Sequence, residues 1–361
     1  MKFNKIILII IPICLIVIIN SCRPDKPIIE EPIDEPYNLE IGSFPNPDIA
    51  TDNPLTREGV KLGRMLFYEK MLSRNNTQAC ASCHNQLTAF SDTNKFSIGI
   101  NNLLGKRQAM SVFNMAWHSN EFFWDGRAHL LRDQSLKPIQ DNLEMDETLN
   151  NVVSKLKASS LYTAQSKKAI GTENIDTFLI SKALEQFMNS IVSNNSKYDK
   201  FLAGTATLTA QEERGRFLFF TEYNPSFPNA TGADCQHCHG GANFENDKYM
   251  NNGIDNDASI TDIGRQKVTN NPNDKGAFKV PSLRNVELTF PYMHDGRFKT
   301  LEEVVDHYNL VKNSTTLDPS FQQQLPNGLQ LTASDKQALV AFLKTLTDTK
   351  LTTDTRYSSP F

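Results

Sequence analysis

Two short stretches decide the fold: Cys80-Ala81-Ser82-Cys83-His84 and Cys235-Gln236-His237-Cys238-His239. On one helical turn, this spacing brings both sulfurs to the same porphyrin edge, where thiols add to the vinyl groups. The next residue, a histidine, then points at the iron. The alternatives are a zinc site built from two cysteine pairs, or thioredoxin-like redox pairs. Because a histidine follows both pairs directly, the sequence predicts two covalently bound haem c groups, with His84 and His239 as proximal iron ligands.

Residues 1–21 have the pattern of an export signal. Two lysines precede an apolar run over residues 6–19, which is too short and too interrupted for a membrane span but suits a secretory segment. The run ends in Ile19-Asn20-Ser21-Cys22, which resembles the lipobox of bacterial lipoproteins. We therefore expect cleavage before Cys22 and a periplasm-facing, membrane-anchored lipoprotein with lipid on Cys22. An ordinary signal peptide with an incidental cysteine is the alternative.

The six cysteines agree with this location. Cys14 would leave with the signal, Cys22 would take the lipid and four would bind haem, so no thiol remains for a disulfide. Attachment of c-type haem is itself completed outside the bacterial cytoplasm. Residues 22–48 are rich in Pro, Glu and Asp, and we expect an extended tether.

The charge balance argues against a nucleic-acid partner. The chain has 37 Lys and Arg against 41 Asp and Glu, a net charge of −4. Loss of residues 1–21 removes two lysines and leaves −6, whereas nucleic-acid-binding proteins carry basic surfaces.

Helix signals dominate the residues after the tether, so the fold class is predicted as mainly α. Helical spacing of apolar residues covers 56–72, 175–193 and about 334–346. Thr209 with Glu212, and Thr300 with Glu303, form possible capping boxes ahead of apolar runs. Segments 221–234 and 245–277 are expected to be long irregular loops. Since the haem histidines are 155 positions apart, we expect one haem in each of two domains, 49–200 and 201–361.

Further strings resemble the bacterial di-haem cytochrome c peroxidase family. The resemblance covers about residues 53–348 and implies two cytochrome-c-like helical domains facing each other, with a tryptophan between the haems. It rests on these strings: Leu62-Gly63-Arg64, Phe122-Phe123-Trp124-Asp125-Gly126-Arg127, Lys137-Pro138-Ile139, Glu144-Met145, Cys238-His239-Gly240-Gly241, Phe278-Lys279-Val280-Pro281-Ser282-Leu283-Arg284-Asn285 and Pro291-Tyr292-Met293-His294-Asp295-Gly296.

The resemblance also implies roles for single residues. His84 would hold the peroxidatic haem, with Gln134 and Glu144 on its distal side, and Trp124 would lie between the haems. Splitting the O–O bond of peroxide requires a proton to move between its oxygens, and a carboxylate over an open iron face can do this. Glu144 is therefore the expected acid–base, and Gln134 would orient peroxide or water. Without the haem context, Glu144 would be a solvated glutamate and Trp124 a core residue.

The sequence departs from the family at the first haem. Many members carry a distal histidine on the loop after the first motif, but residues 85–107 contain no histidine. His118 is the only one before Trp124, and it lies too close to the tryptophan to match. We therefore expect the peroxidatic haem to be open at rest.

A second departure concerns the other haem. The family's methionine ligand, fourteen residues beyond the histidine at position 294, is replaced by Tyr308. An anionic phenolate lowers the haem potential, whereas a thioether raises it. Tyrosine at this place resembles the MauG-like enzymes that mature the tryptophylquinone of methylamine dehydrogenase by oxidising a partner protein. Met293 and His307 are alternative ligands, and His294 is expected near the haem propionates.

The family also holds calcium between its domains, and the corresponding positions are Gln108, Thr289 and Pro291. The leading prediction is a peroxidase that reduces hydrogen peroxide with electrons from a small cytochrome c or cupredoxin. A MauG-like enzyme acting on a partner protein and a pure electron-transfer cytochrome are the alternatives. Many family members are homodimers, which makes a homodimer a further expectation.

Overall fold

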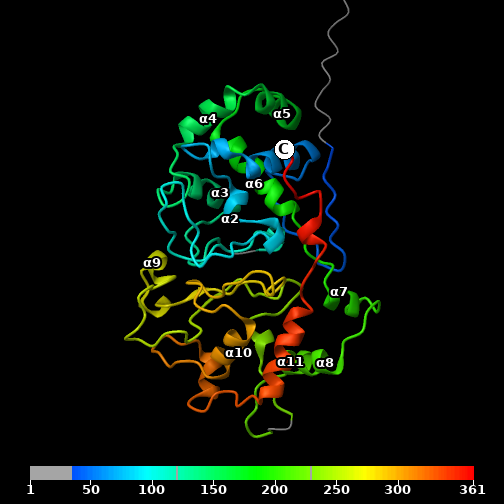
Figure 1. The fold of residues 1–361 in the computed structure, drawn as a ribbon, viewed down its shortest axis with the longest axis vertical. Helices are drawn as coiled ribbons and strands as arrows, with labels where there is room; N and C mark the ends of the chain where they lie inside the picture. The colour runs from blue at the N-terminus through cyan, green and yellow to red at the C-terminus, as the bar shows by residue number, and fades with distance from the viewer. Residues whose placement is uncertain (1–34, 119–120, 228–229) are drawn as a thin grey trace, which may run out of the picture. The chain divides into compact units, whose positions relative to one another are not determined.

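The computed structural model describes residues 35–118, 121–227 and 230–361. The predicted signal peptide and Cys22 lie outside the described residues. Within the described ranges, no helix has the length and apolar character needed to cross a membrane. Helices joined by long irregular segments make up most of the structure (Figure 1). The prediction of a mainly α fold is confirmed.

The α-helices of the described residues are α1 Arg57–Tyr68, α2 Cys80–Cys83, α3 Leu131–Gln140, α4 Leu149–Lys157, α5 Ser160–Ile170, α6 Thr177–Ser190, α7 Lys197–Leu202, α8 Ala210–Phe220, α9 Gln266–Thr269, α10 Leu301–Asn309 and α11 Ala333–Lys344. Short 3-10 turns cover Lys70–Leu72, Gln86–Thr88, Met115–Trp117, Cys235–His237, Pro272–Asp274, Pro319–Gln324 and Leu351–Thr353. Strands β1 Tyr249–Met250 and β2 Phe278–Lys279 pair antiparallel, with Tyr249 opposite Lys279.

The helix starts follow their capping residues. The Thr209 and Thr300 hydroxyls accept the backbone N–H of Glu212 and Glu303, which completes both predicted capping boxes at the starts of α8 and α10. The helix predicted over 56–72 ends at Tyr68, because Glu69 is extended and its carboxylate accepts the N–H of Met71. The described residues of 221–234 are irregular as predicted, whereas 245–277 also contains β1, α9 and one 3-10 turn.

Two buried hydrophobic clusters organise the structure, and we call the parts of the chain around them the first and second lobes. In the first, α1 packs against α6, and Gly63 lets the α1 backbone approach Ala183 and Phe187 closely. In the second, α8 packs against α11, and Gly215 lets α8 approach Ala338 and Phe342 in the same way.

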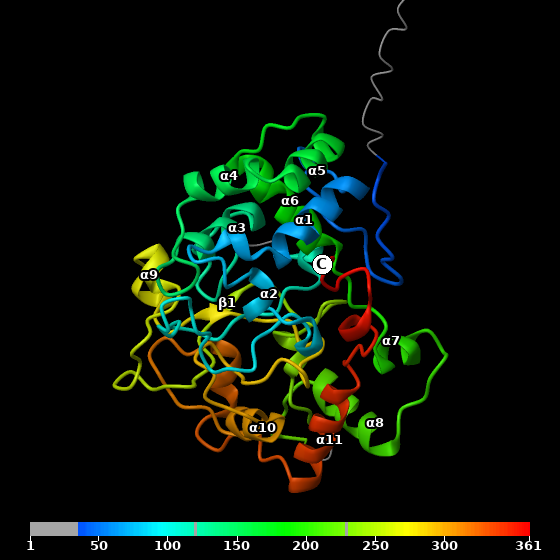
Figure 2. The ribbon, with the colours of Figure 1, turned by 45° about the horizontal axis from the view of Figure 1, so that its top comes forward.

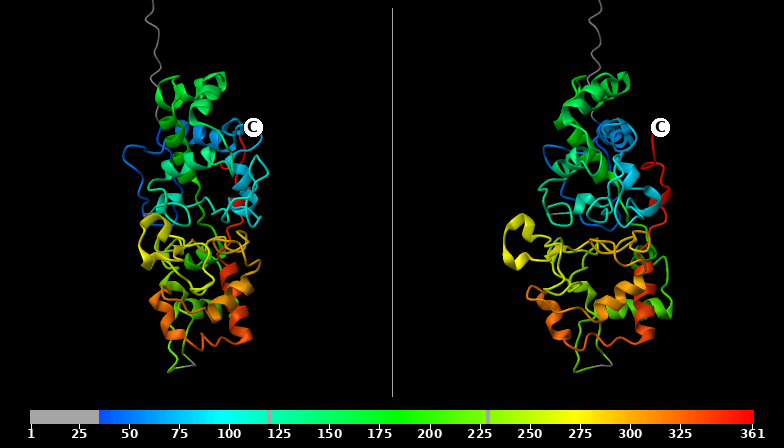
Figure 3. Two further views of the ribbon diagram at one scale, coloured as in Figure 1. Left: turned by 90° about the vertical axis from the view of Figure 1, so that its left-hand side faces the viewer. Right: turned by 60° about the vertical axis from the view of Figure 1, so that its left-hand side comes forward.

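The chain passes from the first cluster to the second between Ile191 and Tyr198, close to the predicted boundary at residue 200. It then returns, because Leu351 and Tyr357 belong to the first cluster. Figures 1 and 2 show the red C-terminal segment running back toward α1. Figure 3 shows the two lobes from two further sides. The division into domains 49–200 and 201–361 stays a prediction.

The described part of the predicted tether differs from expectation. Tyr37 N–H donates to the carbonyl of Leu55 at 2.9 Å, and the Trp117 indole donates to the carbonyl of Pro45 at 2.8 Å. Phe44 is buried and meets the Trp117 ring edge-on. Residues 35–48 therefore lie against the first lobe, because two aromatic side chains in this acidic segment find apolar partners there.

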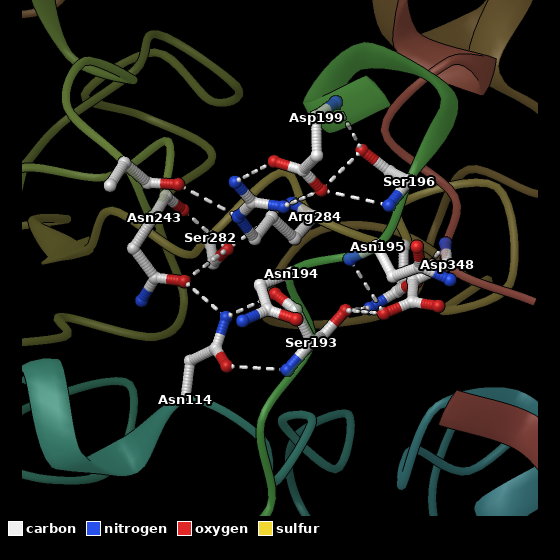
Figure 4. Close-up of polar contacts among 12 residues, drawn as sticks. Asn114, Ser193, Asn194, Asn195, Ser196, Asp199, Asn243, Ser282, Arg284 and Asp348 are labelled. Atoms are coloured by element: carbon white, nitrogen blue, oxygen red, sulfur yellow. Dashed lines mark hydrogen bonds and ion pairs between the residues drawn. The ribbon is translucent and has the colours of Figure 1, made fainter. Parts of the chain in front are cut away.

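Buried polar groups connect the lobes (Figure 4). Asn114 of the first lobe donates from its side-chain amide to the Ser193 carbonyl and to Asn243 Oδ1, both at 3.0 Å. Ser193 N–H donates back to Asn114 Oδ1 at 2.7 Å. Nearby, Arg284 forms a two-pronged ion pair with Asp199, at 2.8 and 2.9 Å. The Asn114, Ser193 and Asn243 groups satisfy one another, so the lobe contact is specific, and the Arg284–Asp199 pair supports it from within the second lobe.

Candidate functional site

The first Cys-x-x-Cys-His motif is a single helical turn. Cys80 and Cys83 begin and end α2, and His84 follows as its C-cap. The Nδ1 of His84 lies 3.1 Å from the carbonyl oxygen of Phe90, to which it donates when it carries the proton. This bond fixes the tautomer and leaves Nε2 available for a metal. Burial lowers the pKa of His84, which keeps the imidazole neutral as a metal ligand must be.

The second motif repeats this arrangement on a 3-10 turn, Cys235–His237. The Nδ1 of His239 lies 3.1 Å from the Pro281 carbonyl oxygen and 3.3 Å from that of Phe244. Burial lowers the pKa of His239 to about 4. Both proximal histidines are therefore held by backbone carbonyls with Nε2 free, which is the donor set that haem iron requires.

The zinc alternative does not fit the structure. Among the described residues, the one group of three or more His, Cys, Asp or Glu side chains with converging donor atoms is His118, Glu245 and Asp247. The four cysteines of the two motifs do not converge on one ion. None of them is in a disulfide, and burial raises the pKa of Cys80, Cys235 and Cys238 to about 12.

A cavity of about 230 Å³ lies beside the second motif. Cys235, Cys238 and His239 line it, together with Tyr308 from α10 and Trp124 from the first lobe. Most of its other lining side chains are apolar, as for a porphyrin site. Two thioether-forming thiols, a free imidazole nitrogen and an apolar wall together fit a haem.

The segment that carries Glu144 is linked to the first motif through residues 98–100. The Gln78 amide donates to Cys83 Sγ at 3.3 Å and to the Ile98 carbonyl at 3.1 Å, and Gly99 packs against the backbone of Leu143 and Glu144. Backbone bonds hold the same segment: the Ile100 N–H donates to the Glu144 carbonyl at 2.9 Å, and the Met145 N–H donates to Pro138 at 3.2 Å. Burial, with a smaller contribution from Asp141, raises the pKa of Glu144 to about 7.

The other predicted distal residue, Gln134, lies on α3. Gln134 is half-buried on this helix, and Pro138 lies inside its last turn, where its carbonyl accepts the bond from the Glu144 segment. The structure thus joins Pro138 to that segment directly. It gives no contact that links the side chains of Gln134 and Glu144.

Trp124 is buried between the lobes. Its indole Nε1–H donates to the Gln108 carbonyl at 2.8 Å, and its own carbonyl accepts the N–H of Lys279 from β2. Its side chain lines the cavity of the second motif. The indole is therefore held by the first lobe while its backbone is held by the second.

Tyr308 faces the same cavity as His239. Its hydroxyl accepts a hydrogen bond from Asn252 Nδ2 at 3.1 Å, and burial raises its pKa to about 12. Met293 also lines the cavity, with its sulfur 3.5 Å from Asn252 Nδ2. His307 Nε2 instead lies 3.1 Å from the Asn252 carbonyl. Of the three candidate ligands, Tyr308 and Met293 are the two that line the cavity.

The three positions predicted for calcium lie along this cavity. Gln108, Thr289 and Pro291 all line it. The Gln108 amide donates to Ser91 Oγ at 3.0 Å and to the Asp92 carbonyl at 3.1 Å. His294, expected near haem propionates, is buried and stacks on Phe278 with ring centroids 3.6 Å apart.

Two residues that support the site were not predicted. Gly99 lies against the Glu144 segment so closely that a Cβ atom would overlap the Leu143 carbonyl. Asn252 supplies the donor to Tyr308. Neither carries a sequence signal, since Gly99 is one glycine in a polar loop and Asn252 one of several asparagines in 245–277.

Two fixed proximal histidines, each behind a pair of cysteines, and a half-buried carboxylate near one motif define the protein as a di-haem c-type cytochrome with a candidate catalytic site. Residues 57–207 match the family described as di-haem cytochrome c peroxidase. The chain belongs to this family, and it is therefore an oxidoreductase with two haem c groups.

Its relatives carry two kinds of name. The chain is 31% identical to the methylamine utilization protein MauG of Methylophilus methylotrophus, over 84% of this chain and 87% of that protein. It is 32% identical to the cytochrome c551 peroxidase of Nitrosomonas europaea, over 83% of each. A solved MauG-like protein associated with microbial copper homeostasis superposes with a TM-score of 0.81 and 33% identity, over 90% of this chain and 99% of that chain.

Proposed function

We propose that the protein reduces hydrogen peroxide to water with electrons from a small cytochrome c or cupredoxin. The observation that carries this proposal is Glu144, a half-buried carboxylate with a pKa of about 7, on a segment linked to the first haem motif. A group with a pKa near the working pH can both accept and return a proton. A carboxylate with its ordinary pKa would be a weaker base and would take the proton from peroxide less readily.

When bound, the first haem supplies the iron that takes up peroxide and the electrons that reduce it. The protein's own part is to place the proton. A carboxylate oxygen of Glu144 accepts the proton from the inner peroxide oxygen and returns it to the outer one, which then leaves as water. Gln134 orients the peroxide through its side-chain amide. His84 would hold the iron through Nε2, because its Nδ1 is bound to the Phe90 carbonyl.

Replacement of Glu144 by Gln tests the proposal. Glu144→Gln keeps the shape but removes the proton carrier, so we expect kcat for peroxide to fall by about 10²–10⁴. Asp133→Asn is the matched control, because Asp133 is an exposed carboxylate on α3 and should leave turnover unchanged. Turnover of Glu144→Gln within about threefold of wild type, with both haems in place, would overturn the role of Glu144.

We also propose that the first haem is open in the resting protein. The support is the sequence of residues 85–107, which contains no histidine to close the distal face. An open haem is expected to give a high-spin ferric signal from one of the two irons. A resting ferric spectrum that is low-spin at both haems would contradict this.

For the second haem, we propose Tyr308 as the distal iron ligand. The tyrosine lines the cavity shared with His239, and its neighbour His307 contacts the Asn252 carbonyl instead. Tyr308→Phe should change the spectrum of the second haem and raise its potential, since a phenolate favours ferric iron. Met293→Leu is the comparison, and an altered spectrum in that variant alone would assign the ligand to Met293.

Tyr308 favours a second candidate function. A phenolate-ligated second haem would let peroxide oxidise a residue on a partner protein, as the resemblance to MauG-like enzymes suggests. Steady-state turnover with reduced cytochrome c separates the two, because an enzyme acting on a protein partner should turn over poorly with cytochrome.

Three further proposals rest on single features. A calcium ion bound by Gln108 and the carbonyls of Thr289 and Pro291 should be removed by chelation, with a measurable change in the haem spectra. The lipid anchor should disappear in Cys22→Ser, as judged by incorporation of labelled fatty acid and release from the membrane. A homodimer should be visible as twice the chain mass in light scattering.

A further inference from the structure

A buried cluster of His118, Glu245 and Asp247 lies where the two lobes meet. His118 follows the 3-10 turn Met115–Trp117 of the first lobe, whereas the carboxylates lie between the second haem motif and β1. The Nδ1 of His118 is 3.1 Å from Asp247 Oδ1 and 3.3 Å from Glu245 Oε1. The side chains of His118, Glu245 and Asp247 are 9%, 4% and 13% exposed, respectively. None of them takes part in the peroxide chemistry proposed above.

The spacing of the three donor atoms matches a single coordination shell. All lie within 4.8 Å of one another. A cation with bonds of about 2.1 Å to nitrogen and oxygen separates neighbouring ligand atoms by about 3.0–3.4 Å in tetrahedral or octahedral geometry. The two distances from His118 Nδ1 fall in or close to this range, although one imidazole N–H can form a well-aligned hydrogen bond to only one of two acceptors.

Glu245 supplies an independent sign of a missing partner. Its Oε1 accepts from Asn243 Nδ2 at 2.5 Å, but its Oε2 is fully buried with no hydrogen-bond partner among the described residues. Asn243 is fixed in turn by the Asn114 contact shown in Figure 4. A buried carboxylate oxygen without a donor is costly, and a cation would remove that cost.

The charges leave room for a cation. Lys279, whose side chain is 2% exposed, places Nζ 2.9 Å from Asp247 Oδ1 and lies over the Tyr249 ring. It thus supports Asp247 from the side of β2. One divalent ion would bring two carboxylates, one ammonium and one imidazole from a net charge of −1 to +1.

We propose that His118, Glu245 and Asp247 bind a divalent transition-metal ion of the zinc type, which links the two lobes. An imidazole with two carboxylates suits zinc and its first-row neighbours, whereas calcium and magnesium prefer oxygen ligands alone. Both carboxylates come from the loop after the second haem motif, so the ion would fix that loop against the first lobe. The site is separate from the proposed calcium position at Gln108.

Calorimetric titration tests this proposal on the protein with both haems in place, since the four motif cysteines are then bound and cannot take up zinc. After treatment with EDTA, wild type should bind one Zn²⁺ per chain, and zinc should raise its melting temperature, whereas calcium should not compete. Glu245→Gln and His118→Asn should each weaken zinc binding by at least about 100-fold. His237→Asn is the matched control and should bind as wild type does, because His237 also lies near a carboxylate, 3.7 Å from Asp234, but is exposed.

The haem spectra show whether each variant has folded. Absence of stoichiometric zinc binding by wild type would overturn the proposal, as would unchanged binding by a folded Glu245→Gln. If the three side chains only share a proton and bind no metal, Glu245→Gln should instead raise the melting temperature in the absence of metal, and this result would also overturn the proposal. Because zinc uptake is measured without peroxide turnover, its failure is distinguishable from a failure of the proposed peroxidase function.

Discussion

At the scale of single residues, Glu144 shows what local sequence could and could not predict. Its place near the first haem motif was expected from the family string Glu144-Met145, and in the structure its backbone pairs with Ile100, on a loop that Gln78 links to Cys83. Its pKa of about 7 could not be predicted, because burial and Asp141 set it through the folded loop. Arg127, from the Trp124 string, acts in the opposite direction and lowers that pKa.

These contributions predict the pH dependence of turnover. Glu144 must be ionised to accept a proton, so kcat/KM should fall as the pH drops below about 7. Asp141→Asn removes a negative charge and should shift this fall in kcat/KM to lower pH. Arg127→Gln removes a positive charge and should shift the fall to higher pH. The measurement is the pH profile of peroxide turnover in the three proteins. An identical fall in all three would show that another group titrates.

The same pKa has a consequence for stability. Because burial raises the pKa of Glu144 above its unfolded value, this carboxyl favours the folded state below about pH 4.5 and loses that contribution as the pH rises through about 7. Glu144→Gln should therefore become more stable relative to wild type as the pH rises across this window. Thermal denaturation at several pH values measures the difference, and a constant difference from pH 4 to 8 would contradict it.

At the scale of helices, the two lobes repeat one design that the sequence only partly indicated. In each lobe, the helix before the haem motif contains a glycine at which it packs closely against a later helix. Gly63 contacts Ala183 and Phe187, and Gly215 contacts Ala338 and Phe342, so in both lobes the glycine meets an alanine and a phenylalanine four residues apart. Apolar periodicity predicted α1, α6 and α11, and the Thr209–Glu212 capping box predicted the start of α8. Neither could predict their pairing, because helical spacing identifies the buried face of a helix but not its partner.

This close approach predicts a large effect from a small substitution. In Gly63→Ala and Gly215→Ala, the added Cβ would overlap the carbonyl of Ala183 or Ala338, so the helices must separate. Overpacking of this kind costs about 1–3 kcal/mol, more than alanine gains in helix propensity. We expect melting temperatures to fall by about 2–4 °C for each kcal/mol of net destabilisation in a lobe of about 150 residues. Gly105→Ala is the control, since its Cβ would find ordinary contacts no closer than 3.6 Å. Equal melting temperatures in all three variants would exclude the glycine contact as the cause.

At the scale of the whole molecule, the C-terminal segment links the two lobes in a way that sequence order concealed. After α11 completes the second core, Arg64 Nε donates to the Ser358 carbonyl at 2.6 Å and the Tyr68 hydroxyl donates to the Tyr357 carbonyl at 2.7 Å. Gln86, two residues after His84, donates to the Leu351 carbonyl at 3.0 Å. The segment lacks any helical period long enough to assign it to a core, so its return to the first lobe could be seen only in three dimensions.

Removal of residues 351–361 should therefore destabilise the first lobe, which is distant in sequence, more than the second lobe, which directly precedes the segment. The deletion takes Leu351 and Tyr357 out of the first core, and loss of a large buried side chain typically costs about 2–5 kcal/mol. It leaves the second cluster, which ends at Leu346, without a lost member. We expect the first haem to lose its native spectrum at a lower temperature while the second keeps its own, as followed by haem absorption and circular dichroism during heating.

Tyr357→Phe removes only the hydroxyl that accepts the Val192 N–H at 3.2 Å, and should lower the unfolding temperature of the first lobe by a smaller amount. Equal loss at both haems in the deletion would mean that the lobes unfold as one unit, and that the segment stabilises their contact rather than the first core.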